Sequence, residues 1–207
     1  MIELIEIKEN TIDKKASDGK VDEGIEAVKL KEVNIEFLML PKTIDELRLI
    51  NRTGNNGKFI TVALLIAALK AWKTNDEETC AEMMKELLNS PTVPNNYNNF
   101  TKSFVKDRML QNDKYLFLAD AYFDGAEPNN GYKPSEPLTV TLREYPYAPQ
   151  VSKMYGPELY VEKIVSDFKG ADSERSVSVY QDPKDHKWYI WSDSYKSLLV
   201  DVKPIIK

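Results

Sequence analysis

The hydrophobic pattern of this 207-residue chain changes near Gly131. Between residues 41 and 124, apolar residues recur at the spacing of amphipathic helices. Beyond Gly131 they recur at every second residue, and tyrosine and tryptophan become frequent, as in half-buried strands. A helical layer and a sheet each need a partner for their apolar face. We therefore expect an α+β fold: N-terminal strands, a layer of about four helices, and a C-terminal antiparallel β-meander packed on it.

The first two helices have clear sequence signals. Thr43 and Glu46 match a capping box, so a helix is expected to begin there. The segment from Gly57 to Lys73 is apolar on all sides in its middle, which predicts the central buried helix.

Two further helices are expected after it. Asn75 is expected to cap a helix whose apolar stripe, from Cys80 to Leu88, is the most regular in the chain. A fourth helix is expected from Asn96 to Leu110, with Tyr97, Phe100 and Phe104 facing inward.

We expect residues 1–207 to form a single domain, with a helical part at 41–112 and an antiparallel β part at 133–203. Residues 1–32 are expected to be partly mobile, and 33–40 to add a strand to a sheet of about four to six strands. The segment 115–123 is expected to be extended or irregular. The strand at 159–168 loses its alternation near Lys163, which indicates a bulge.

The composition argues against several classes of function. A net charge of −5 with few arginines argues against nucleic acid as a partner. No signal peptide is recognisable, and the longest apolar stretch, 59–72, is too short to cross a bilayer, so we expect a cytoplasmic protein without membrane contact. Catalytic groups are scarce: His186 is the only histidine and Cys80, expected to be buried, is the only cysteine. We expect no cofactor and favour a non-enzymatic role.

Three weak motifs have simpler interpretations. The segment 54–58 (GNNGK) resembles a phosphate loop, but its glycines are too close together, so a helix end followed by a helix start is favoured. Asp120, Asp124 and Glu127 match no calcium loop and are expected to form a solvated turn. His186 is expected to be an exposed hairpin residue.

The aromatic residues of the C-terminal part provide the strongest functional lead. In a strand, Trp188 and Ile190 must point to one face, and Tyr189 and Trp191 to the other. One set therefore belongs to the core. The other either packs or lies exposed, where aromatic rings stack on sugars or anchor a protein interface.

Three segments resemble the signatures of a family of uncharacterised bacterial proteins, a domain of unknown function. They are Tyr122–Pro137 (pattern YFxGAxPxNxYxPxxP), Gly170–Arg175 (GADSER, matching GADSxR) and Trp188–Trp191 (WYIW, matching WYxW). The resemblance extends over residues 40–204. It implies a shared fold and no established activity.

Within these signatures, Tyr132 and Arg175 join Trp188, Tyr189 and Trp191 as candidate binding residues. For Arg175, a structural ion pair is the favoured alternative to a grip on a ligand. No catalytic, cofactor-binding or metal-binding residue is expected.

Three functions remain open at this point. The favoured one is a non-enzymatic protein-interaction or binding domain, with another protein as the possible partner. The second is a carbohydrate- or peptide-binding sheet face that uses exposed aromatic rings. The third is a carboxylate-dependent hydrolase, which needs two acidic side chains converging in one pocket. The sequence leaves the oligomeric state open.

Overall fold

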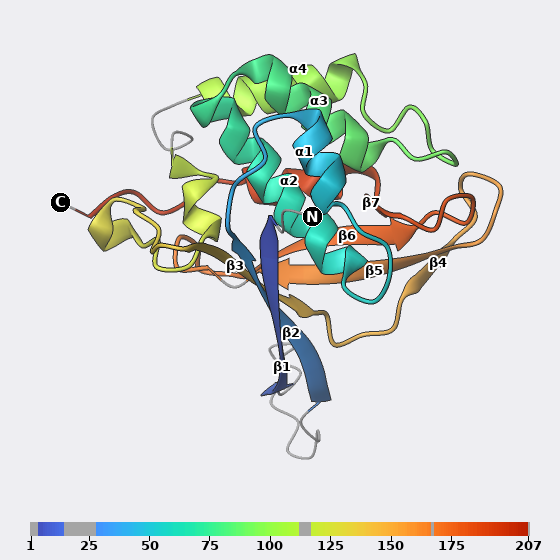
Figure 1. Ribbon diagram of the computed structural model, residues 1–207, viewed down its shortest axis with the longest axis horizontal. Coiled ribbons are helices and arrows are strands. Elements are labelled where there is room, and N and C mark those ends of the chain that lie inside the picture. Colours follow the sequence, from blue (N-terminus) through green and yellow to red (C-terminus); the bar gives the residue numbers. More distant parts are fainter. Residues whose placement is uncertain (1–3, 15–27, 112–116, 167, 207) are drawn as a thin grey trace.

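The computed structural model describes residues 4–14, 28–111, 117–166 and 168–206 of the chain. Its strands form one seven-stranded antiparallel sheet with the order β1-β2-β3-β5-β6-β7, in which β4 also pairs with β5 (Figure 1). The strands are β1 (Ile5–Lys14), β2 (Val28–Phe37), β3 (Leu138–Glu144), β4 (Gln150–Ser152), β5 (Leu159–Ser166), β6 (Arg175–Gln181) and β7 (Trp188–Ile190). Spatial neighbours are mostly sequence neighbours, so the expected meander is confirmed.

The α-helices lie together on one face of the sheet (Figure 1). They are α1 (Ile44–Ile50), α2 (Gly57–Thr74), α3 (Glu77–Leu88) and α4 (Asn99–Leu110). Short 3-10 helices complete the fold: η2 (Asp120–Tyr122), η3 (Pro128–Asn130) and η4 (Ser192–Leu199). The expected α+β architecture, a helical layer on an antiparallel sheet, is confirmed.

Helix α2 is the centre of the hydrophobic core. It packs against α3 on one side and against β2, β3, β5, β6 and β7 on the other. Most of its residues are therefore buried, including the continuous run from Phe59 to Leu69. This explains why its sequence is apolar on every side rather than on one stripe.

The helix starts agree only in part with the sequence. Thr43 does cap α1 by accepting a hydrogen bond from Glu46 N, but the Glu46 carboxylate accepts from Lys42 N rather than from the cap residue. For α3 the expected cap Asn75 is wrong. Asp76 accepts from Thr79 N instead, because Asn75 closes the end of α2.

The expected inward face of α4 is also wrong in one position. The helix begins three residues later than expected, with Asn98 as its cap, and its buried side chains are Thr101, Val105 and Met109. Phe100 lies one residue from this stripe, about 100° around the helix, and is 66% exposed.

The described part of the N-terminal segment forms two long strands. Residues 5–14 and 28–37 pair as antiparallel strands of ten residues each, and the second strand pairs with β3 and buries Val33, Ile35 and Phe37. Residues 33–37 of the expected strand 33–40 thus belong to β2, and residues 38–40 lie beyond its end. Residues 1–3 and 15–27 of the expected mobile stretch 1–32 lie outside the described residues, as do residues 115–116 of the segment 115–123 that was expected to be extended or irregular. The described remainder of that segment contains the turn η2.

The bulge expected near Lys163 is absent from the described β5–β6 ladder. The register runs without a break from Val161, opposite Tyr180, to Ser166, opposite Arg175. The alternation of apolar residues breaks because β5 is buried on both faces. Val161 packs in a small cluster on the outer face, whereas Ile164 lies under the helices.

The two faces of β7 are separated as expected. Trp188 and Ile190 belong to the main core, while Tyr189 packs on the outer face with Trp191 beside it. The outer cluster consists of Val93, Leu159, Val161, Tyr180 and Tyr189. Val93 comes from the connection between α3 and α4, so this connection reaches the outer face of the sheet.

Candidate functional site

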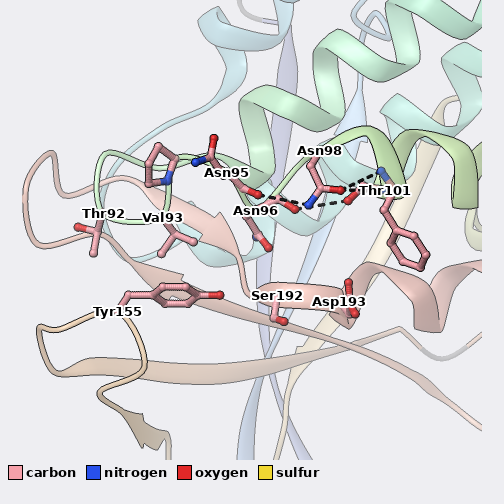
Figure 2. Close-up of a pocket in the computed structure, with 11 residues that line it drawn as sticks. Thr92, Val93, Asn95, Asn96, Asn98, Thr101, Tyr155, Ser192 and Asp193 are labelled. Carbon is pink, nitrogen blue, oxygen red and sulfur yellow. Dashed lines mark hydrogen bonds between the residues drawn. The ribbon is translucent and has the colours of Figure 1, made fainter.

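A groove opens where the α3–α4 connection meets the outer aromatic cluster. We call it the Tyr155 groove; its volume is about 440 Å³, within the usual range for ligand sites. It is lined by Thr92, Val93, Pro94, Asn95, Asn96, Asn98, Phe100, Thr101, Tyr155, Ser192 and Asp193. Figure 2 shows the Tyr155 ring below the connection, with its hydroxyl directed toward Ser192.

Buried hydrogen bonds hold one wall of the groove in place. The Asp182 carboxylate, which is fully buried, accepts from Thr92 N at 2.9 Å and from Lys184 N at 2.8 Å. Ser90 Oγ accepts from Val93 N and from the Tyr180 hydroxyl, at 2.9 and 2.7 Å. These bonds fasten the α3–α4 connection to the β6–β7 hairpin.

The electrostatics of this anchor favour an ionised carboxylate. Burial opposes ionisation of Asp182, but hydrogen bonds from Ser90, Lys184 and Thr92 outweigh that effect and lower its pKa. Because a buried charge is tolerated only when it is well hydrogen-bonded, the wall depends on this set of bonds.

A row of four aromatic rings supports the opposite wall. Tyr155 meets Trp191 edge to face at a centroid distance of 5.5 Å, and Trp191 meets Tyr180 in the same way at 5.4 Å. Tyr180 lies 6.1 Å from Tyr189, whose hydroxyl donates to Asp185 at 2.6 Å. Burial raises the pKa of Tyr189. The row fixes the ring of Tyr155, which is partly exposed at the groove.

The polar lining of the groove is mostly neutral. Asn98 is engaged as the cap of α4, and the Asn96 amide donates to Leu88 O and Ile190 O. Asn95 is exposed. Asp193 is the only charged residue of the lining, and it accepts from Lys196 at 2.7 Å. A ligand with its own N–H and C=O groups, and without negative charge, suits this lining.

The sequence-predicted candidates fall into separate regions. Tyr189 and Trp191 belong to the aromatic row behind the groove. Trp188 points to the other face, where its ring lies against Gly57: a Cβ added at Gly57 would be 2.4 Å from Trp188 Cδ1. Neither Trp188 nor Tyr189 is exposed, and Trp191 is half-buried.

Tyr132 and Arg175 both contact the C-terminal segment. The Tyr132 hydroxyl donates to Lys203 O at 2.7 Å. The Arg175 guanidinium donates to Ser173 Oγ and Asp201 O and lies 5.9 Å from the Phe168 ring. The described contacts of Arg175 therefore go to a hydroxyl, a carbonyl and a ring rather than to the carboxylate that the ion-pair interpretation implied.

One pair of carboxylates converges, but not in the way a hydrolase needs. Glu144 and Glu162 both accept from Lys58 Nζ, at 2.8 and 2.7 Å. Burial opposes ionisation of Glu144, but its hydrogen bonds with Lys58 and Lys31 prevail and lower its pKa. A general acid in glycoside hydrolysis needs a raised pKa, so this pair matches an ion-pair network.

The solvated turn expected from Asp120, Asp124 and Glu127 is wrong for Asp120, which is buried and binds Lys70 and Lys73. Asp124 accepts from the Thr141 hydroxyl, so the acidic residues have separate partners. Within the described part of the chain, no three histidine, cysteine or acidic side chains gather as metal ligands. Gly54 stands at a positive φ of 97° before α2, as a helix boundary requires.

Sequence reasoning missed most of the groove. Asn95 was expected in a loop and Asn96 and Asn98 at the start of the fourth helix, so the three asparagines were not recognised as a group. Tyr155 was recognised as one of many aromatic residues, and Asp193 gave no signal. These residues come from three distant segments that only the tertiary structure brings together.

Comparison with known proteins adds one finding. Residues 39–206 match the model of one protein family, described as domain of unknown function DUF6935. No curated protein and no solved structure matches the chain. None of the described helices is both long and apolar enough to cross a bilayer.

Proposed function

The chain belongs to the DUF6935 family, for which no function is established, and we propose from its own geometry that it is a non-enzymatic protein-interaction domain. Its ligand is an extended segment of a partner protein, bound in the Tyr155 groove. The observation that carries this proposal is the combination of a preorganised groove with neutral amide groups and an aromatic rim. Preorganisation matters because ordering a loop on binding costs affinity.

Exposed apolar side chains beside the groove support a protein ligand. Phe100, which lines the groove, is 66% exposed, and Met154, next to Tyr155 in the β4–β5 hairpin, is 72% exposed. Large exposed apolar side chains close to a groove are typical of interaction surfaces. A carbohydrate could stack on the Tyr155 ring, but it would gain little from contact with an aliphatic side chain such as Met154.

The charge of the groove supports a neutral or basic segment. Asp193 is the only charged lining residue, so a phosphorylated or acidic ligand would find no partner there. Asn96 and Asn98 make hydrogen bonds within the fold, whereas the Asn95 carboxamide is exposed and offers both a donor and an acceptor, as a peptide unit does. The groove can therefore pair with the main chain of an extended peptide while Tyr155 and Phe100 contact its side chains.

The proposal is tested with a phage-displayed random peptide library. Peptides are selected on the wild-type protein alone, and the affinity of each is then measured on wild type and on Tyr155→Ala. We expect selected peptides to lose roughly 30-fold in affinity on Tyr155→Ala, the effect of removing an aromatic anchor of about 2 kcal/mol. Tyr147→Ala is the matched control, because Tyr147 is also an exposed tyrosine but does not line the groove.

Two outcomes would count against the proposal. Peptides that bind Tyr155→Ala as well as wild type would place recognition elsewhere. Binding of a neutral oligosaccharide on a glycan array, lost in Tyr155→Ala, without any groove-dependent peptide would favour the carbohydrate-binding alternative instead. A bacterial origin and a cytoplasmic location remain part of the proposal, and the signature segments support the bacterial origin.

A further inference from the structure

Three side chains from three elements meet beside the N-terminus of α2. Lys31 Nζ of β2 lies 2.7 Å from Asn56 Oδ1, next to the first residue of α2. Glu9 of β1 contacts both: its Oε2 is 2.8 Å from Lys31 Nζ, and its Oε1 accepts from Asn56 Nδ2 at 2.6 Å. An amine, a carboxamide and a carboxylate are thus mutually within hydrogen-bond distance.

We propose that Lys31 and Asn56 form an intramolecular isopeptide bond, with Glu9 as the proton carrier. Glu9 Oε2 takes a proton from the Lys31 ammonium, and the free amine attacks Asn56 Cγ. Glu9 Oε1 then delivers this proton to Nδ2, and the C–N bond of the carboxamide breaks. The second proton lost by the Lys31 nitrogen goes to the departing ammonia, which leaves as ammonium. One C–N bond forms and one breaks, so the step needs no oxidant and no co-reactant.

The two oxygens of Glu9 are placed for this transfer. One contacts the nucleophile and the other contacts the leaving group, which is the position a general acid–base group requires. The hydrogen bond from Lys31, followed by the one from Asn56, lowers the pKa of Glu9. Its carboxylate is therefore ionised at neutral pH but is a weaker base, so its role as proton carrier rests on the placement of its two oxygens.

The backbone holds the reacting groups in place, which raises the rate of an intramolecular reaction. Lys31 N donates to Glu144 Oε2 at 3.2 Å, and the Asn56 carbonyl accepts from Phe59 N and Ile60 N at the start of α2. The Lys31 ammonium also lies 5.8 Å from the Phe59 ring. Nucleophile and carboxamide are thus both fixed to regular elements.

A competing reaction at the same asparagine leaves a different product. Gly57 follows Asn56, and attack by Gly57 N would form a succinimide with the same loss of ammonia. That nitrogen instead donates to Gly54 O at 3.0 Å.

The isopeptide bond would connect two parts of the chain. Lys31 lies in β2, before the residues 39–206 that match the family, and Asn56 lies within them.

Mass spectrometry of the purified native protein tests the proposal. We expect an intact mass lower than the sequence mass by one ammonia, and, after proteolysis, a cross-linked peptide pair containing Lys31 and Asn56. Lys31→Arg and Glu9→Gln should both restore the full sequence mass. Lys29→Arg, an exposed lysine on the same strand, is the matched control and should keep the loss.

Either of two results overturns the proposal. One is an intact mass equal to that of the sequence in folded protein. The other is a loss of ammonia without a cross-linked peptide, which identifies the succinimide. Neither result depends on ligand binding, so this proposal stands or falls separately from the function of the Tyr155 groove.

Discussion

The anchor of the Tyr155 groove can be weakened by one isosteric change, Asp182→Asn. An asparagine keeps one acceptor oxygen but turns an N–H toward the second backbone donor, either Thr92 N or Lys184 N. A buried hydrogen bond to a charged group contributes about 1.5–3 kcal/mol. We therefore expect Asp182→Asn to lower the free energy of unfolding by about 2 kcal/mol at neutral pH, roughly 4–8 °C in Tm for a chain of this size.

The pH dependence of this loss provides a second test. The folded-state pKa of Asp182 is lowered, so its contribution is present above the unfolded-state pKa of about 3.9. It is lost as the pH falls through the folded-state pKa. The stability gap between wild type and Asp182→Asn should therefore shrink in acid.

Urea denaturation followed by circular dichroism, at neutral and acidic pH, measures both effects. Asp172→Asn is the control: the Asp172 side chain is 92% exposed and pairs with Lys203, so its loss should be within about 0.5 kcal/mol. If Asp182→Asn is as stable as Asp172→Asn at neutral pH, or if the gap does not change with pH, the account of the anchor is refuted.

Three further predictions concern the core. Gly57→Ala should lower the urea midpoint, by about 1–3 kcal/mol of stability, because its Cβ would overlap the Trp188 ring; an unchanged midpoint would contradict this packing. Tyr132→Phe should lower the free energy of unfolding by about 1 kcal/mol, because the hydrogen bond to Lys203 O is lost. An unchanged Tm in thermal unfolding would contradict this hydrogen bond. Burial raises the pKa of the Cys80 thiol to about 12, so iodoacetamide should leave the folded protein unmodified near pH 8 and alkylate it after denaturation; rapid alkylation of the folded state would contradict this.

The sequence predicts the fold class because local patterns and packing agree. The all-apolar run in α2 could only be a helix surrounded by other elements, and the alternation around β3 could only be a half-buried strand. The sequence predicts the cap residues and the inward faces of helices less accurately. Asn75 and Asp76 are both good caps, and a shift of the α4 start turns Phe100 out of the core.

The groove was beyond sequence reasoning for a physical reason. Its walls come from the α3–α4 connection, the β4–β5 hairpin and the start of η4, and no local pattern encodes their meeting. The aromatic pattern of β7 correctly separated Trp188 from Tyr189 and Trp191. It could not indicate that the exposed ring at the end of the aromatic row would be Tyr155, because that depends on the edge-to-face contact with Trp191.

The central claim is that the Tyr155 groove binds a peptide segment. The most direct measurement is a titration of ¹⁵N-labelled protein with a library-selected peptide, followed by NMR of the backbone amides. We predict that the largest shift changes fall on residues 92–101, on Tyr155 and on Ser192 and Asp193. Shift changes centred elsewhere, for example around Tyr145 and Lys163 where the end of β3 meets β5, would contradict the claim.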